Sequence, residues 1–513
     1  MTAVRPEDLP TADTDVLVVG AGPTGLMAGL VLARTGLTAM VADQKSGPTR
    51  ESRALAVQAR TMEIYDQLGL AERVMSGAYH AARMQIGDRG PAGGGVGIDR
   101  VQLGATRFPG IQIFEQSRNE ELLSGELTRS GREILWGHRL IDLTDATSEP
   151  DGRVVALLEG PDGLIRVRAR WCIGADGASS AVRRILNVPF DGVTDEATFW
   201  VADVRGLQGP PDQTMTMRFG TSTFGLTFPL GPGGHARLVS LALDDHVDQD
   251  PALALARDDL GLAFDSVDWF SSYRVHHRVA SRFRVGSVFL AGDAGHVHSP
   301  VGGQGMNTGL QDAHNLALLL ADIASGHLDP VALDRYERER RPVAVTLVKV
   351  TDRMFGIIGR RGTTVALLRR FGSSAAAGLA PRLLGTRLGA RLGGYLGQYR
   401  IRYHYLSKGN RRPAWADDRI VGLRLPPAGD NYQALRRLTW QLHTYGTQAD
   451  RPDLPNWIEH PQDFGPDKHQ RLRPDRLYLV RSDGFVAASL PLRAKSADSS
   501  QLRAALAAHG IKS

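Results

Sequence analysis

Cysteine is almost absent from this sequence of 513 residues, since Cys172 is the single one. One cysteine cannot form an intramolecular disulfide, a cysteine-based zinc site or a CxxC redox motif. Lysine is also scarce, because six of the 61 basic residues are Lys and the others are Arg. The net charge of +6 favours small anionic molecules, but it is too weak and too dispersed to indicate nucleic acid as a partner.

Long apolar runs are missing as well. No stretch reaches the roughly twenty apolar residues of a membrane-spanning helix, so no span is expected. Residues 1–15 are polar and acidic, unlike a signal peptide, and we expect a cytoplasmic protein. With 42% hydrophobic and 23% charged residues the composition is that of a globular protein, and the length suggests roughly two to four domains.

A dinucleotide-binding pattern lies near the N-terminus. The β-branched run 15–19 predicts a buried strand, which leads into Gly20-Ala21-Gly22-Pro23-Thr24-Gly25. A helical pattern follows and ends near Gly36, and a second strand, 38–42, ends on Asp43. The Gly-rich turn therefore has the neighbours that a dinucleotide site requires, although the pattern alone does not distinguish FAD from NAD.

Each residue of this pattern has a physical role. Gly20 permits the tight turn, Gly22 lets the backbone approach a pyrophosphate, and Gly25 lets helix and strand pack closely. The helix N-terminus presents N–H groups to the phosphates. Asp43 can accept hydrogen bonds from the adenosine ribose hydroxyls.

Two later segments favour FAD. In 171–183 a strand ends in Gly174-Ala175-Asp176-Gly177, and Ser179 can cap the next helix; an Asp176 that merely caps its own backbone is the alternative. In 288–313 a strand delivers Asp293 to its carboxyl end, where it can bind a ribityl hydroxyl. A glycine-rich loop, 300–305, then leads to a helix that begins near Met306, whose N–H groups suit the flavin N1–C2=O edge.

In this order and spacing, the three motifs resemble the class A flavoprotein monooxygenases of the p-hydroxybenzoate hydroxylase fold, above all the phenol and aromatic-polyketide hydroxylases of actinobacteria. The resemblance covers nearly the whole chain. It implies these FAD-binding positions: Gly20, Gly22, Pro23, Thr24, Gly25, Asp43, Gln44, Arg53, Gln116, Leu140, Asp176, Gly292, Asp293, Pro300, Gly302, Gly303, Gly305, Met306 and Asn307. The chain departs from the family at Asn315-Leu316, where relatives carry Trp-Lys before the Leu, and we expect a change of packing only.

The resemblance also implies an α/β architecture in several parts. A discontinuous Rossmann-type FAD-binding domain would comprise 1–80, 110–190 and 280–345, and an antiparallel-sheet substrate domain would comprise 81–109 and 191–279. A basic helical segment, 346–412, and a thioredoxin-like domain, 413–513, would follow. In the last part, the run 476–480, the turn 482–484 and a strand from Phe485 predict a hairpin.

Alternating apolar residues in 199–204, 214–219, 224–230 and 236–243 predict a sheet that roofs the flavin. The pocket candidates are Trp200, Met215, Met217, Phe224, Phe228 and Pro300. On the same alternation Arg218 faces away from the methionine row, toward solvent. No side chain stands out as a base that would deprotonate a phenol, so catalytic residues stay unassigned.

Three basic or histidine-rich features favour ordinary roles. Thirteen Lys or Arg lie between positions 353 and 412 without a carboxylate, which fits a docking face for an anionic partner but fits a solvated helical face better. His296 and His298 lack the carboxylate cluster of a metal site, and no metal is expected. His276 and His277 fit a strand or the surface.

The chemistry that the resemblance implies is reduction of FAD by NADH or NADPH, addition of O2 to give a flavin C4a-hydroperoxide, and oxygen transfer to an aromatic ring. With no second GxGxxG, the nicotinamide would dock transiently. A multi-ring phenolic or polyketide-like substrate is favoured, and a homodimer is expected. The alternatives are a single-ring phenol hydroxylase and a flavin-binding partner protein without turnover. A disulfide reductase would need CxxC, and a flavin halogenase would need WxWxIP; neither is present.

Overall fold

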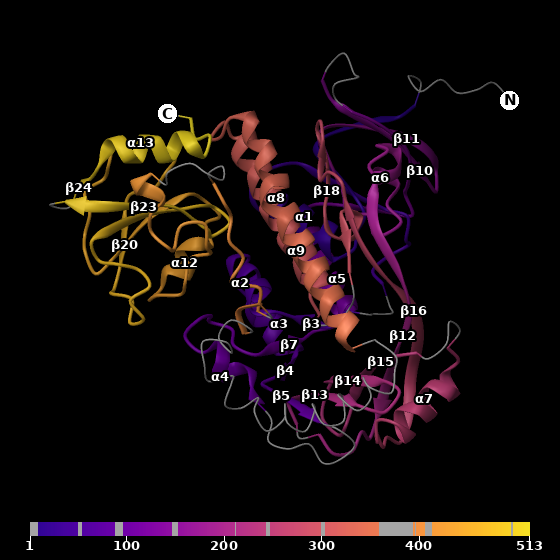
Figure 1. The fold of residues 1–513 in the computed structure, drawn as a ribbon. Helices are drawn as coiled ribbons and strands as arrows, with labels where there is room; N and C mark the ends of the chain where they lie inside the picture. Colours follow the sequence, from indigo (N-terminus) through magenta and orange to yellow (C-terminus); the bar gives the residue numbers. More distant parts are fainter. Residues whose placement is uncertain are drawn as a thin grey trace.

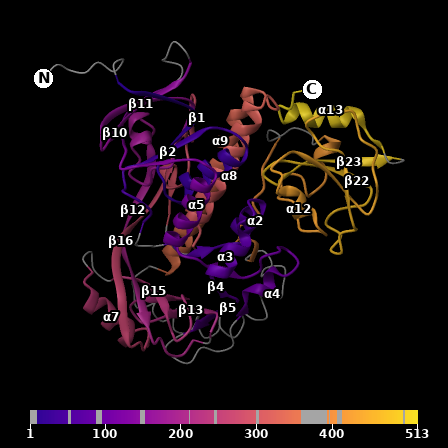
Figure 2. The same ribbon diagram turned by 180° about the vertical axis from the view of Figure 1, so that it is seen from behind.

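The computed structural model describes residues 9–49, 54–87, 96–145, 152–210, 212–242, 247–298, 303–358, 393–395, 397–405, 413–493 and 496–512. Most of the basic segment expected at 346–412 lies outside the described residues, and so do three predicted flavin positions, Arg53, Pro300 and Gly302. The described chain is a mixed α/β structure (Figures 1 and 2).

The first sheet, called the parallel sheet here, carries the N-terminal fingerprint. Its strands are, in spatial order, β17 (Arg284–Val285), β18 (Val288–Leu290), β11 (Gly163–Gly174), β1 (Thr11–Val19), β2 (Ala39–Asp43) and β8 (Ile134–Trp136), with β10 (Val154–Gly160) and β9 (Arg139–Thr144) attached beside β11. The pairs β18–β11, β11–β1, β1–β2 and β2–β8 are parallel. Their carboxyl ends therefore meet at one edge, where ligands bind in open α/β sheets.

The second sheet, called the roof sheet, contains the four predicted apolar segments. Its order is β19 (His296–Val297), β16 (Ser266–Ala280), β12 (Phe190–Arg205), β15 (Ala236–Leu241), β14 (Phe224–Pro229), β13 (Thr214–Phe219), β5 (Arg83–Gly87) and β6 (Val96–Gly97). All neighbours are antiparallel except β13 and β5, which are parallel. Two long strands of the roof sheet, β12 and β16, extend beyond its shorter strands, and their upper ends lie beside the parallel sheet (Figure 1).

The C-terminal unit has its own sheet, in the order β21 (Gln462–Phe464), β20 (Gln441–Tyr445), β22 (Arg476–Val480), β23 (Val486–Arg493) and β24 (Ser496–Ala497). The predicted hairpin is present, because β22 and β23 pair antiparallel around residues 481–485. A three-stranded sheet of β3 (Ala56–Val57), β7 (Ile111–Ile113) and β4 (Tyr79–Ala81) lies elsewhere, between the roof sheet and α2.

Helices lie between these sheets and around them (Figure 1). They are α1 (Pro23–Arg34), α2 (Ala59–Gln67), α3 (Ala71–Gly77), α4 (Ile98–Gln102), α5 (Gln116–Arg129), α6 (Ala181–Ile185), α7 (Gln249–Asp258), α8 (Gly305–Ala324), α9 (Asp334–Ile358), α12 (Asn431–Leu435) and α13 (Ser499–Ala508). Both ribbon views place α8 and α9 between the parallel sheet and the C-terminal unit (Figures 1 and 2).

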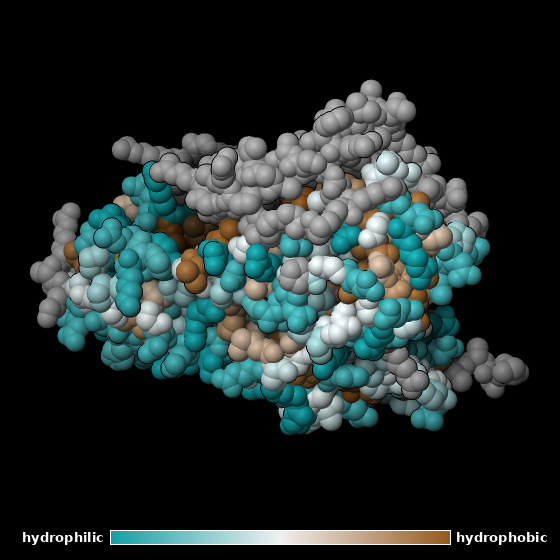
Figure 3. Space-filling model, turned by 90° about the horizontal axis from the view of Figure 1, so that it is seen from below, coloured by the Kyte–Doolittle hydropathy of each residue, from teal (hydrophilic) through white to brown (hydrophobic). Residues whose placement is uncertain are grey.

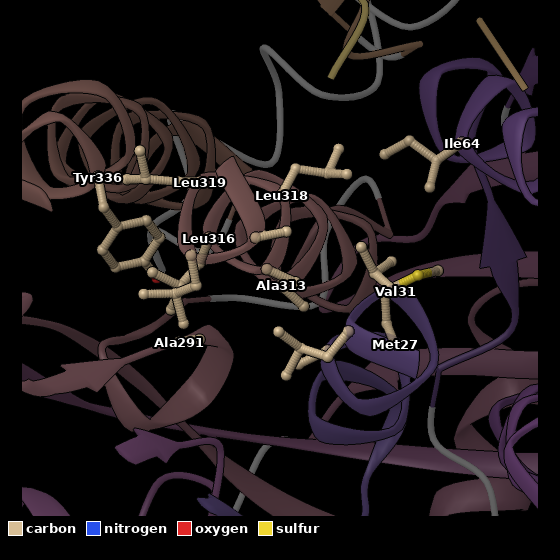
Figure 4. Close-up of a cluster of buried hydrophobic side chains, with 14 of the residues drawn as sticks. Met27, Val31, Ile64, Ala291, Ala313, Leu316, Leu318, Leu319 and Tyr336 are labelled. Atoms are coloured by element: carbon tan, nitrogen blue, oxygen red, sulfur yellow. The ribbon is translucent and has the colours of Figure 1, made fainter. Parts of the chain in front are cut away.

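Helix α8 is the centre of the largest core. Nearly every residue from Asn307 to Ile323 is buried, which requires apolar neighbours on all sides. Figure 4 shows Ala313, Leu316 and Leu318 of α8 among side chains from α1, α2, α9 and Ala291, which follows β18. The helix therefore joins elements that are far apart in sequence.

The described surface carries few large exposed hydrophobic side chains. They are Met75, Leu103, Ile141, Leu164, Val193 and Val331, which belong to different parts of the chain. Seen from below, the described surface is mostly hydrophilic with scattered hydrophobic patches (Figure 3). Within the described ranges, no helix is long and apolar enough to cross a membrane.

Leu316→Ala tests the role of α8 in the core. Leu316 is fully buried, so the truncation should cost about 2–5 kcal/mol and lower the melting temperature by several degrees. Leu103→Ala is the matched control, because Leu103 is 76% exposed and should change stability by less than about 0.5 kcal/mol. Equal shifts in scanning calorimetry would contradict the assignment of α8 to the core.

Candidate functional site

One cavity of about 640 Å³ connects the carboxyl edge of the parallel sheet with the roof sheet. Its walls come from all three predicted flavin motifs and from β14, β15 and β16. The lining residues are Gly22, Pro23, Thr24, Thr49, Ala54, Leu55, Ala56, Gln116, Ala175, Gly177, Ala178, Leu226, Phe228, Val239, Trp269, Tyr273, Arg274, His276, Asp293, Val297, His298, Gly303, Gln304, Gly305 and Met306. A continuous space thus joins the glycine-rich turns to an aromatic wall.

The N-terminus of α1 opens onto this cavity. Gly22 is the N-cap residue, and no described side chain caps it. A Cβ on Gly22 would meet nothing within 4 Å, whereas one on Gly25 would lie 1.8 Å from the Gly20 carbonyl oxygen. Gly20 has φ +105°, and its own Cβ would meet the Ala175 carbonyl oxygen at 2.3 Å. Gly20 and Gly25 are thus required for packing, while Gly22 leaves room for a ligand.

The acid at the end of β2 lies beside the turn and not in the cavity lining. One Asp43 carboxylate oxygen accepts a hydrogen bond from the Ala21 N–H at 2.6 Å, and the other accepts one from the Lys45 N–H at 2.8 Å. Asp43 therefore holds the Gly-rich turn in place. Gln44 is exposed beside it, and Leu140 is buried in β9, so neither side chain lines the cavity.

Asp176 caps the short helix α6. Its carboxylate accepts hydrogen bonds from the Ser180 hydroxyl at 2.5 Å and the Ala181 N–H at 2.6 Å. Burial raises the pKa of Asp176, although these hydrogen bonds partly counter the effect. The prediction that Ser179 caps this helix is wrong by one residue, because Ser180 is the N-cap and accepts from the Arg183 N–H. Of this motif, Ala175, Gly177 and Ala178 line the cavity.

Arg183 joins two of the motifs, a role that the sequence analysis missed. Its buried guanidinium donates to the Ala178 carbonyl at 2.7 Å and to the Ala294 carbonyl at 2.8 Å. The same group lies over the Phe190 ring. Because Ala178 and Ala294 belong to different loops, one side chain fixes the distance between them.

Two neighbouring carboxylates after β18 are in opposite electrostatic situations. Asp293 lies open to the cavity, and burial within the protein, together with the nearby Asp312, raises its pKa although His296 lowers it. Burial would raise the pKa of Asp312 too, but the charges and hydrogen bonds of Arg340 and His296 hold it below the usual value. Asp312 therefore has two bonded charged partners, whereas Asp293 is left open to the cavity.

Asp312 also shapes the turn that carries Asp293. It accepts hydrogen bonds from the Gly292 N–H at 3.1 Å and from Arg340 Nε at 2.6 Å, and it pairs with His296 Nε2 at 2.7 Å. The histidine is thus a partner of a buried carboxylate. Within the described ranges, no group of three or more His, Cys, Asp or Glu side chains could hold a metal ion.

The loop before α8 is fastened to β3 by Asn307. The Asn307 side chain accepts from the Gln58 N–H at 2.8 Å and donates to the carbonyls of Ala56 and Gly303, both at 2.7 Å. Gln304 is the N-cap of α8, and no described side chain caps that end. Gly305 and Met306, at this end of the helix, line the cavity, and the N–H groups of a helix's first turn have no partner within the helix.

The roof sheet supplies the opposite wall, with one correction to the predicted pocket. Phe228 lines the cavity, and Met215, Met217 and Phe224 lie in the hydrophobic cluster on the same face of the sheet. Trp200 was assigned to the wrong face. It packs on the other side of β12, against Phe270 and beneath α7, because adjacent strand residues point in opposite directions.

Arg218 requires a second correction. It does face away from the methionine row, but it is buried and donates to the Leu260 and Gly261 carbonyls, so it does not reach solvent. Residues 259–264 and α7 cover that face. Arg237, on the cavity-side face, is buried and paired with Asp203 and Glu115.

Strand β16 contributes cavity residues that the sequence analysis missed. Trp269, Tyr273, Arg274 and His276 all line the cavity. The alternation of Trp269, Ser271 and Tyr273 was the available signal, but the stretch was not recognised as a strand facing the pocket. Other lining residues were missed as well: Thr49, 54–56, Ala175, Ala178 and Gln304, all of which except Thr49 lie within three residues of a predicted position.

The comparisons with known proteins agree with this geometry. A family model described as "FAD binding domain" matches residues 13–351. A flavin-dependent monooxygenase of Mycobacteroides abscessus is 32% identical over 493 residues, which are 92% of this chain and 96% of that protein. The FAD-dependent monooxygenase terD of Aspergillus terreus is 32% identical over 358 residues, 65% of this chain, and the match spans only 58% of its length.

Solved structures point the same way. The anhydrotetracycline hydroxylase OxyS from Streptomyces rimosus has a TM-score of 0.75 at 27% identity, covering 98% of this chain and 100% of that one. The fold and the site thus define the class of FAD-dependent aromatic monooxygenases, as predicted. The chain belongs to the FAD-binding domain family, and FAD is its cofactor.

Asp293→Ala tests the ribityl contact. Loss of one acceptor that faces the cavity should weaken FAD binding by about 1–3 kcal/mol, or up to about a hundredfold. Asp258→Ala, at an exposed position on α7, is the control and should leave the FAD dissociation constant unchanged. Unchanged affinity in folded Asp293→Ala, measured by flavin fluorescence, would show that the contact is misplaced.

Asp293→Asn tests the electrostatics of the flavin-free protein. A carboxyl whose pKa is raised on folding destabilises the fold at neutral pH, and the penalty disappears as the pH falls below its ordinary pKa of 3.8. The flavin-free variant should therefore melt above the wild type at pH 7, with the difference shrinking toward pH 4. A gain that did not depend on pH, or the same gain in Asp258→Asn, would refute this reading.

Proposed function

We propose that this monooxygenase hydroxylates a multi-ring phenolic or polyketide-like substrate, with NADH or NADPH and O2 as co-substrates. The observation that carries the proposal is the wall opposite the flavin motifs. It is built by Leu226, Phe228, Val239, Trp269 and Tyr273, which offer flat apolar and aromatic area. Such a wall holds a ligand mainly by burying its rings.

The charges around the cavity support the same choice. Two arginines of the roof sheet, Arg218 and Arg237, are engaged elsewhere and do not line the cavity. Arg274, His276 and His298 do line it, so a phenolic oxygen on one edge of the substrate would find hydrogen-bond donors. A single-ring carboxylated phenol is the competing substrate, and Arg274 is the residue that would favour it.

The residues present fit FAD, because two helix N-termini and a carboxylate face one cavity in which Gly22 leaves open space. Bound FAD supplies the redox chemistry that activates O2. Gly22, Pro23 and Thr24 would hold the pyrophosphate, Asp293 would accept from the ribityl chain, and Gly305 and Met306 would donate toward the flavin ring. The roof sheet would hold the substrate ring and exclude water.

For the C-terminal unit we propose a thioredoxin-like arrangement. In support, β20 has a parallel neighbour, β21, and an antiparallel one, β22, which continues into β23. The single cysteine lies outside it, in β11, so the unit carries no dithiol chemistry. We also propose the domain division of the sequence analysis, with FAD-binding, substrate and C-terminal parts.

Phe228→Leu tests the substrate wall. It keeps an apolar side chain but removes ring stacking, so multi-ring phenols should bind about three- to tenfold more weakly. Trp200→Phe, on the far face of the sheet, is the control and should leave affinity unchanged. Flavin absorbance changes on titration with single-ring and multi-ring phenols give both affinities. Coupled turnover of a single-ring carboxylate, with no response to larger phenols, would overturn the proposed substrate.

A further inference from the structure

The turn between β22 and β23 reaches out of the C-terminal unit and is buried against other parts of the chain. Arg481, Ser482 and Asp483 are each at most 3% exposed. Turns usually lie at the surface and are polar for that reason. Burial of this one indicates that its polar groups have partners outside the hairpin.

Those partners lie on α8 and α9. Arg481 donates to both Glu339 carboxylate oxygens, at 2.5 and 2.9 Å, and to Asp483 at 2.7 Å. The Asn315 amide donates to Asp483 and to Glu339, both at 3.0 Å. Burial alone would raise the pKa of Asp483, yet the Arg481 and Arg335 charges hold it below the usual value. The position at which the chain departs from its relatives, Asn315, is therefore a hydrogen-bonding link and not a packing change alone.

The same turn also contacts α8 further along its length, and it contacts helix α2. The Ser482 hydroxyl donates to Asp322 on α8 at 3.1 Å, and Trp440 Nε1 donates to the same carboxylate at 2.9 Å. The Asp483 carbonyl accepts from Arg60 on α2 at 2.8 Å. Both ribbon views show the C-terminal unit beside α2 (Figures 1 and 2).

These two helices carry one wall of the flavin cavity. Residues 54–56 precede α2, residues 303–306 lead into α8, and both stretches line the cavity. Asn307 binds the two stretches to each other through Ala56 and Gly303. A shift of either helix relative to the other would thus move the cavity wall.

We propose that the turn 481–484 is a positioning element for the flavin site, in which Asp483 and Arg481 set the relative placement of α2 and α8. The C-terminal unit then acts on the reaction without touching the cofactor. This inference rests on the proposed flavin site, and it predicts that loosening the turn changes flavin binding at a distance.

Asp483→Asn in the full-length protein is the test, because it removes the charge and keeps the shape. The FAD dissociation constant should rise by about tenfold, and the visible circular dichroism of bound flavin should change, at temperatures below the onset of unfolding. The rate of NADPH oxidation in the absence of the aromatic substrate should change as well, because a shift of α2 or α8 would move the cavity wall.

Asp467→Asn is the matched control. Asp467 is also a buried carboxylate of the C-terminal unit paired with an arginine, Arg471, which binds the carbonyls of Gly104 and Pro427 and, within the described ranges, has no hydrogen bond to α2 or α8. It should leave FAD affinity within about twofold of the wild type. Equal loss in both variants would overturn the inference, since general weakening of the unit would then explain it.

A folded Asp483→Asn protein with wild-type FAD affinity and spectrum would also overturn the inference. If Asp483→Asn does not fold, Asn315→Ala, which removes the α8 side of the same contact, must raise the FAD dissociation constant in the same way. Wild-type protein that bound no FAD would overturn the proposed function and this inference together, so the two failures are distinguishable.

Discussion

The constraint on which most of this structure depends is the burial of α8. A helix enclosed along almost its whole length is stabilised when its polar side chains are paired by its neighbours, because an unpaired polar group in the interior costs about 1–3 kcal/mol. Asp312 binds Gly292 of the flavin turn and Arg340 of α9, whereas Asn315 and Asp322 bind the C-terminal unit. The hydrogen bonds that pair the polar side chains of α8 therefore fix the flavin turn, α9 and the C-terminal unit relative to each other.

The contrast between the body and the end of α8 explains why the site lies where it does. Along the body, buried charges are compensated, as Asp312 is by Arg340 and His296. At the end, described groups leave the N-terminus uncapped, and Asp293 faces the cavity with a raised pKa. Polar and charged groups that have few protein partners thus gather where a ligand can bind them. In this respect a functional site differs from the rest of the fold, where such groups are paired within the protein.

How much could be predicted depended on whether the signal was local. The fingerprint at Gly20–Gly25, the four roof strands and the hairpin at 481–485 were recognisable because turn residues and alternation act within a few positions. The face of each strand was harder. Trp200 was predicted to line the pocket, and that prediction is wrong because the packing of α7 covers its face while the face of Phe228 opens to the cavity. The burial of Arg218 follows from the same distant contact.

The docking of the hairpin turn shows why such contacts escape local patterns and yet are specific. Arg481 and Asp483 form a pair that would suit an exposed turn equally well, so nothing nearby in sequence predicts their burial. Once buried, such a network is weak evidence for stability, because desolvation offsets much of the attraction. The network is stronger evidence that the turn has one defined position along α8 and α9. Docking displaced by one helical turn would separate Glu339 from Arg481 and Asp322 from Ser482, and each of these buried carboxylates would lose a hydrogen-bond donor. These charged contacts thus favour one position of α8 relative to the C-terminal unit. Because α8 carries part of the cavity wall, the same contacts favour one position of that wall.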